Sequence, residues 1–81
     1  MTIKEEAVEV LVKKAASLFG KDEKELSEKT SFKDDLNCKS TNIVQFSTAL
    51  EDHFDIEVPY MELARRKTFG EAGDLMEELF G

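Results

Sequence analysis

Few side chains in this chain could do chemistry, and their spacing does not form a catalytic set. The only cysteine is Cys38 and the only histidine is His53. A histidine activates a hydroxyl or thiol only within hydrogen-bond reach, but on a helix His53 would lie more than about three turns from Ser40. The sequence also has no glycine-rich phosphate loop. We therefore predict that the chain is not an enzyme and that His53 is a solvated surface residue.

The acidic pair Asp34 and Asp35 raises the question of calcium binding. An EF-hand loop that starts at the second of these residues requires particular side chains at three later positions. It needs Asp or Asn where Lys39 stands, Gly where Ser40 stands and Glu where Phe46 stands. All three requirements fail. A lone cysteine cannot form a thiolate cluster or an internal disulfide either, so we predict no metal site.

Size and charge narrow the possible partners. With 81 residues, the chain is expected to form a single domain over residues 1–81. Its net charge of −7 repels phosphate backbones and anionic headgroups but attracts basic protein patches. We expect protein partners and no nucleic acid. No apolar run reaches the roughly 20 residues of a bilayer span, and the start does not resemble a signal peptide, so we expect a cytoplasmic protein without stable membrane insertion.

The apolar pattern predicts the first element that would position these residues. Thr2 and Glu5 match a capping box, and apolar residues then recur at helical spacing until Gly20, a plausible stop. Residues 21–39 are polar and irregular, with isolated apolar anchors that suggest a loop held against a core. The anchors are Leu26, Phe32 and Leu36, and the predicted buried helix face is Val8, Leu11, Val12, Ala15, Leu18 and Phe19.

Ser40 opens a second amphipathic segment, and because serine is a preferred N-cap residue we predict that its hydroxyl caps this helix. The helix should end near Phe54, since residues 56–59 read as extended before Pro59. The predicted buried face is Ile43, Val44, Phe46, Ala49, Leu50 and Phe54.

Two more helices complete the predicted fold. A short one is expected over residues 61–66, and Thr68 with Glu71 forms a second capping box that opens the last helix. No strand pair or internal repeat is visible. We predict an all-α bundle of three main helices plus one short helix, with a long loop after the first. The predicted buried face of the last helix is Phe69, Ala72, Leu75, Met76, Leu79 and Phe80.

The order of these pieces resembles the acyl carrier protein family. Residues 34–43 read Asp-Asp-Leu-Asn-Cys-Lys-Ser-Thr-Asn-Ile, and the family's motif is an acidic residue and Leu, a short turn, then Asp-Ser-Leu at the start of the second helix. The resemblance covers nearly the whole chain and rests on order and spacing. Other matching pieces are Phe32, residues 49–52, residues 56–59 and residues 68–71.

The resemblance implies that Ser40 carries 4′-phosphopantetheine, which a separate phosphopantetheinyl transferase takes from coenzyme A. The terminal thiol of this arm would hold acyl groups as thioesters, so the chemistry belongs to the arm and to partner enzymes. Acyl-loading and acyl-transfer enzymes would meet the chain through an acidic face. We expect a free-standing protein, because the chain begins at Met1 and ends one residue after its last predicted core position. We also expect a monomer. Serines without the motif's context are Ser17, Ser27, Ser31 and Ser47.

Several positions depart from the family pattern. Lys39 replaces the Asp before the serine, Thr41 replaces the Leu after it, and Asn42 and Gln45 stand where acidic residues are usual. Each exposed contact that such carboxylates make is worth at most roughly 1 kcal/mol. We therefore hypothesise a carrier dedicated to one pathway rather than to general fatty-acid synthesis. The residues expected to contact partners are Asp35, Lys39, Thr41, Asn42, Gln45, Glu51 and Asp52.

In this family an acyl chain can fold back between the second and third helices, where each buried methylene gains about 0.8 kcal/mol. Phe46 and Phe69 are larger than the residues usual at their positions, so we predict a smaller or reshaped pocket and weaker sequestration of the acyl chain. Plain core packing explains these rings equally well. The expected pocket residues are Phe46, Leu50, Met61 and Phe69.

Two alternatives stay open. A peptidyl or polyketide carrier shares the fold and the arm but holds different cargo. An unmodified acidic helical domain would keep the bundle and use its acidic face for protein interaction alone. The intact mass after incubation with coenzyme A and a broad-specificity transferase separates this second alternative from a carrier.

Overall fold

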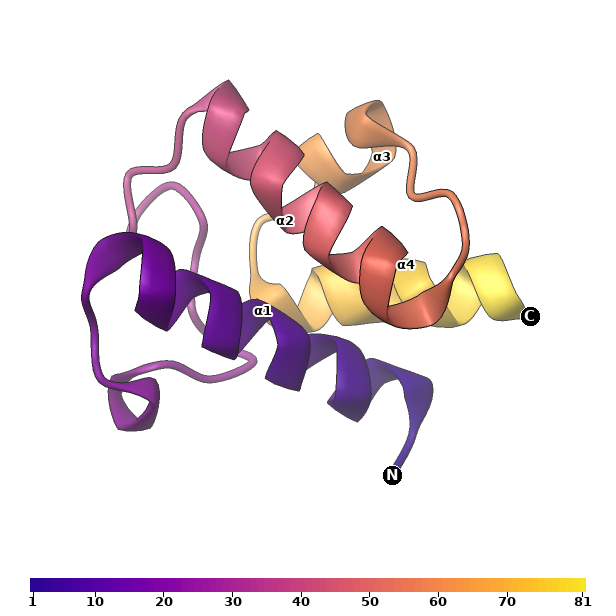
Figure 1. Cartoon of the computed structure of the whole chain (residues 1–81), viewed down its shortest axis with the longest axis horizontal. Coiled ribbons are helices and arrows are strands. Elements are labelled where there is room, and N and C mark those ends of the chain that lie inside the picture. Colours follow the sequence, from indigo (N-terminus) through magenta and orange to yellow (C-terminus); the bar gives the residue numbers. More distant parts are fainter.

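Four α-helices make up the computed structural model, which describes residues 1–81. Helix α1 packs against α4, α2 crosses above α1, and the short α3 lies beside α2 (Figure 1). The all-α prediction is confirmed, since the only strand-like contact is an isolated bridge between Ser31 and Thr68. The elements are α1 (Ile3–Phe19), a 3₁₀ turn η1 (Glu23–Glu25), α2 (Ser40–Phe54), α3 (Tyr60–Ala64) and α4 (Phe69–Phe80).

Helix α1 begins and ends as the sequence predicts. The Glu5 amide donates to Thr2 Oγ1 at 3.0 Å, and the Thr2 amide donates to Glu5 Oε1 at 2.9 Å. Gly20 ends the helix with a φ of 65°, a left-handed conformation that suits a residue without Cβ. The fully buried face of α1 has fewer residues than predicted, and two of them are alanines. Its residues are Ala7, Leu11 and Ala15.

The small side chains of α1 face a close helix contact. Gly73 of α4 lies so near α1 that a Cβ at this position would come within 2.8 Å of Lys4 Cγ and 3.1 Å of the Lys4 carbonyl oxygen. Lys4 Nζ also pairs with Asp74 Oδ1 at 3.0 Å, and this pairing raises the pKa of the Lys4 ammonium. The first turn of α1 is therefore held against the middle of α4.

Three aromatic rings from distant parts of the chain meet in the core. Phe32 comes from the long loop, Phe46 from α2 and Phe69 from the start of α4. Their centroids are 4.9 to 5.9 Å apart in tilted or edge-on geometry, the arrangement that aromatic pairs prefer. Leu26 and Leu36 are buried beside them, which confirms that the loop is held against the core.

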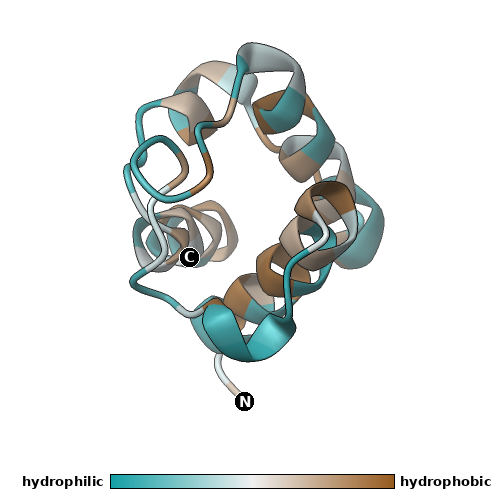
Figure 2. Cartoon of the chain, turned by 90° about the vertical axis from the view of Figure 1, so that its left-hand side faces the viewer, coloured by the Kyte–Doolittle hydropathy of each residue, from teal (hydrophilic) through white to brown (hydrophobic).

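Hydrophobic and hydrophilic residues alternate along the long helices (Figure 2), as expected for helices that bury one face. Three residues predicted to be in the core, and one predicted to line the acyl pocket, are nevertheless exposed. The first turn of α1 lies opposite Glu77, whose carboxylate accepts the Lys4 amide at 3.3 Å. The last turn of α4 therefore extends past α1. The exposed fractions are 50% for Val44, 63% for Met61, 39% for Leu79 and 47% for Phe80.

Local geometry explains the other differences. Val44 lies about 100° around α2 from the buried Ile43 and so faces outward. In α3 the buried residue is Leu63 instead of Met61. At α4, Thr68 Oγ1 accepts the Glu71 amide at 3.2 Å. The Glu71 carboxylate, however, accepts the Lys67 amide instead of the Thr68 amide that a capping box requires.

No helix here combines the length and apolar content needed to cross a bilayer.

Candidate functional site

Ser40 is the first residue of α2, and its exposed hydroxyl makes no hydrogen bond within the chain. The prediction that Ser40 caps the helix is wrong. The N-cap is Lys39, whose amide donates to Asn42 Oδ1 at 2.9 Å. Because the Asn42 side chain already reaches back to the N-cap, the helix begins at Ser40 and the serine hydroxyl stays free.

The turn before Ser40 is fixed by hydrogen bonds. The Cys38 amide donates to the Phe32 carbonyl at 2.9 Å, and the Asn37 amide donates to the Lys33 carbonyl at 2.9 Å. Asn37 has a φ of 51°, a left-handed conformation that Asn tolerates better than most residues. Leu36 is buried in the core. These contacts hold Ser40 at the end of an ordered, exposed turn.

The start of α2 provides a favourable environment for an anion. The backbone amides of Ser40 and Thr41 have no acceptor within the chain, as is usual for the first turn of a helix. No acidic residue lies in this first turn. Free amides and the positive end of the helix dipole both favour a phosphate group. The Ser40 hydroxyl and these amides therefore fit a covalently attached phosphodiester.

Other serines are less suitable for modification. The hydroxyl oxygens of Ser27 and Ser31 each accept a backbone amide at 3.1 Å. Ser47 is buried, and its hydroxyl donates to the Val58 carbonyl at 3.0 Å. Ser17 is exposed, but it lies in the last turn of α1, where the helix dipole disfavours an anion. Among these serines, Ser40 alone combines a free hydroxyl with a helix N-terminus.

Cys38 lies two residues before Ser40 and is partly buried. Burial raises the pKa of its thiol from 9.0 to about 11, because a thiolate loses hydration there. The thiolate is the reactive form of cysteine. Cys38 is therefore a poor nucleophile near neutral pH.

The residues predicted to contact partners occupy different settings. Lys39, Thr41 and Gln45 are exposed around Ser40, and Gln45 Oε1 accepts a hydrogen bond from Asn42 Nδ2 at 3.1 Å. The sequence analysis therefore missed the capping role of Asn42, because the usual signature has Ser or Thr at the N-cap and Glu or Gln three residues later.

The acidic members of the predicted set also make structural contacts. The Asp35 carboxylate accepts the Ser31 amide at 2.7 Å, within the turn before Ser40. The Glu51 carboxylate accepts the Val58 amide at 2.8 Å and stabilises the segment between α2 and α3. Asp52 is exposed further along α2. The structure thus gathers the polar residues near Ser40 but places Glu51 and Asp52 away from them.

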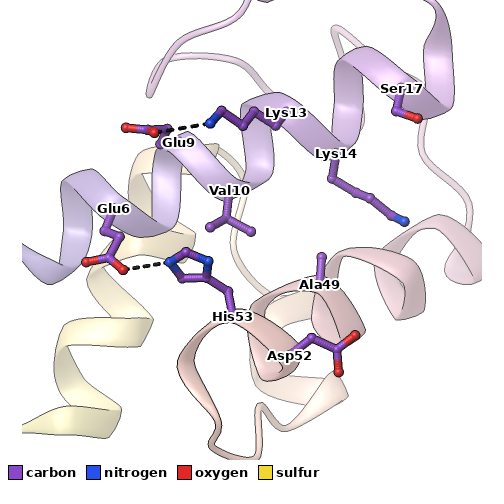
Figure 3. Close-up of a pocket in the computed structure, with 9 residues that line it drawn as sticks. All are labelled: Glu6, Glu9, Val10, Lys13, Lys14, Ser17, Ala49, Asp52 and His53. Atoms are coloured by element: carbon purple, nitrogen blue, oxygen red, sulfur yellow. Dashed lines mark hydrogen bonds and ion pairs between the residues drawn. The ribbon is translucent and has the colours of Figure 1, made fainter.

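Asp52 and His53 line a groove of about 520 Å³ between α1 and α2 (Figure 3). His53 Nε2 lies 2.6 Å from Glu6 Oε2, and the two side chains are 43% and 40% exposed. The surface location predicted for His53 is confirmed. Its link to α1 joins residues 47 positions apart, a contact that no local sequence pattern indicates.

The predicted acyl-pocket residues do not share one setting. Phe46, Leu50 and Phe69 are fully buried, whereas Met61 is mostly exposed on α3. None of the surface pockets is lined by any of these four residues.

Comparison with known proteins agrees with this geometry. Residues 9–76 match the family model described as "Phosphopantetheine attachment site". The chain is 39% identical over 57 residues to the acyl carrier protein of Lactobacillus acidophilus, and this alignment covers 70% of this chain and 71% of that protein. It is 32% identical over 75 residues to the acyl carrier protein of Rubrobacter xylanophilus, and this alignment covers 93% of each protein. The chain belongs to the acyl carrier protein family.

Membership of the family gives this acyl carrier protein its prosthetic group, a covalently attached 4′-phosphopantetheine. It also makes the chain a carrier and not a catalyst. A carrier of this kind interacts with synthesis enzymes and with a transferase.

Proposed function

We propose that this carrier holds acyl groups as thioesters on a 4′-phosphopantetheine arm attached to Ser40 Oγ, with residues 1–81 acting as a single monomeric carrier domain. The observation that carries the proposal is the free hydroxyl of Ser40 beside two unpaired amides at the start of α2. This site lies within the residues that match the phosphopantetheine family.

The attachment is a phosphoryl transfer from coenzyme A, catalysed by a separate phosphopantetheinyl transferase. The Ser40 oxygen bonds to the phosphorus next to the pantetheine unit, the pyrophosphate bond breaks, and 3′,5′-ADP leaves. The hydroxyl proton passes to a base on the transferase. Free first-turn amides then favour the new phosphodiester through the helix dipole.

The test is intact mass after incubation with coenzyme A and a broad-specificity transferase. We expect a gain of one phosphopantetheine group in the wild-type chain and no gain in Ser40→Ala. Ser17→Ala is the matched control, because it removes another exposed serine hydroxyl, and it should load like the wild type. An unchanged wild-type mass, or equal loading of Ser40→Ala, would refute the attachment site.

We further propose that the carrier serves one dedicated lipid-synthesis pathway. Lys39 is exposed next to Ser40, and the first turn of α2 has no acidic residue. Partner enzymes with basic docking patches would lose attractive contacts here. At roughly 1 kcal/mol or less for each exposed contact, three lost contacts reduce the preference of such enzymes by up to about a hundredfold.

The loading rate on general fatty-acid synthesis enzymes tests this proposal. We expect slower loading of this chain than of a housekeeping carrier, with partial recovery in the double variant Lys39→Asp/Gln45→Glu. Both substitutions leave the capping contact of Asn42 in place. Lys13→Asp/Ser17→Glu, at two exposed positions of α1, adds the same three negative charges away from Ser40 and is the control for charge alone. Equal rates for this chain and the housekeeping carrier would contradict a dedicated role.

A further inference from the structure

A second groove lies next to Ser40, on the side formed by the long loop, the start of α2 and the segment between α3 and α4. Its volume is about 470 Å³, within the range of roughly 300–1,000 Å³ that is usual for small-molecule sites. Its apolar lining residues are Phe32, Cys38, Ile43 and Ala64. Its charged lining residues are mainly cationic: Lys33, Arg65, Arg66 and Lys67, with Asp34 as the one acidic residue.

This concentration of positive charge contrasts with the protein as a whole, which has a net charge of −7. Two of the four cations are already paired: Arg65 lies 3.8 Å from Glu62, and Arg66 lies 3.3 Å from Glu78. Lys33 and Lys67 make no ion pair within the chain. The groove therefore has two cations available for an anionic ligand.

Backbone contacts join the two segments that carry these lysines. The Phe32 amide donates to the Lys67 carbonyl at 3.0 Å, beside the isolated bridge between Ser31 and Thr68. The next contact along the same pair of segments joins the Phe69 amide to the Thr30 carbonyl at 3.0 Å. The two sides of the groove are thus fixed to each other by main-chain hydrogen bonds and do not depend on side-chain pairing.

The groove lies close to the attachment residue. Cys38 is two residues before Ser40, and Ile43 is three residues after it on α2. Three residues of helix span about 4.5 Å along the axis. Lining residues of the groove therefore lie within one helical turn of the attachment residue.

We propose that this groove holds the distal end of an acyl cargo that carries a terminal carboxylate. The apolar lining would contact the methylenes, and Lys33 and Lys67 would pair with the carboxylate. This inference rests on the proposed attachment at Ser40 and adds the chemical class of the cargo. A neutral acyl group lacks the charge to pair with the two lysines.

Two cargoes of equal length test the proposal. The wild-type chain is loaded with glutaryl- or pentanoyl-phosphopantetheine from the corresponding coenzyme A thioesters, and loading is verified by intact mass. The two five-carbon groups differ in having a carboxylate or a methyl at the far end. We expect glutaryl to shift the amide NMR signals of Phe32, Ile43 and Lys67 more than pentanoyl does, and added salt to reduce the difference.

Variants identify the cations responsible. In Lys33→Gln/Lys67→Gln we expect the docked-to-undocked ratio of the glutaryl group to fall about fivefold, as for the loss of exposed ion pairs. Lys14→Gln/Lys21→Gln removes the same charge outside the groove and should leave the ratio unchanged. Equal shifts for both cargoes, or glutaryl shifts that survive the groove variant, would overturn the inference while leaving the attachment intact. A chain that fails to load overturns the attachment itself.

Discussion

The ring of Phe46 fills the centre of the bundle, so replacing it with a smaller residue should create room for an acyl chain. Phe46 is fully buried, and its ring centroid lies 5.3 Å from that of Phe32 and 5.9 Å from that of Phe69. Each aromatic pair is worth about 0.5–1.5 kcal/mol beyond burial. We therefore expect Phe46→Leu to lower the free energy of unfolding by about 1–3 kcal/mol.

An acyl chain that enters the new space should return part of this loss. Each buried methylene gains about 0.8 kcal/mol, so two methylenes of an octanoyl group would gain about 1.6 kcal/mol. For a domain of this size, 1 kcal/mol changes Tm by roughly 4–8 °C. We expect octanoyl-loaded Phe46→Leu to melt at least about 6 °C above its acetyl-loaded form, and the two wild-type forms to melt within about 2 °C of each other.

Thermal unfolding followed by circular dichroism measures these differences. Val44→Ala is the control, because Val44 is half exposed on the same helix and its truncation should not make melting depend on the acyl chain. The reasoning fails if octanoyl raises the wild-type Tm as much as that of Phe46→Leu. It also fails if octanoyl shifts the wild-type NMR signals of Phe46, Leu50 and Met61 as strongly as in ordinary carriers.

Two further predictions concern Cys38 and Gly73. With its pKa raised to about 11 by burial, Cys38 should react with iodoacetamide at pH 8 about 100-fold more slowly than a thiol of pKa 9.0. The rate should rise up to about pH 11, and unfolding in urea should abolish the difference. An ordinary rate in the folded Ser40→Ala chain would contradict this. Gly73→Ala should lower the free energy of unfolding by about 1–3 kcal/mol despite the better helix propensity of alanine, because the new Cβ meets Lys4. Urea unfolding measures this change. A more stable variant would show that α1 can move away from α4.

Most helix boundaries follow from local chemistry and could be predicted. The first helix is bounded by Thr2 and Gly20, and the second ends at Phe54, because caps and apolar periodicity depend on neighbours a few residues apart. The start of α2 could not be fixed this way. Ser40 and Asn42 both offer a capping oxygen, and the structure uses that of Asn42.

Contacts between distant segments account for what the sequence did not reveal. The exposure of Leu79 and Phe80 depends on where α1 begins relative to the end of α4. The cationic groove depends on main-chain hydrogen bonds that join the loop near Phe32 to Lys67. Such pairings are set by tertiary packing, and helical periodicity carries no information about them.

Because Asn42, not Ser40, secures the beginning of α2, esterification of the serine would leave every hydrogen bond of the fold unchanged. The loaded protein should then be slightly more stable than the unloaded one, because its phosphodiester meets the positive end of the α2 dipole. Repeated attachment and removal of the arm would cost the protein no refolding, so turnover of the prosthetic group could be governed entirely by the enzymes that add and release it.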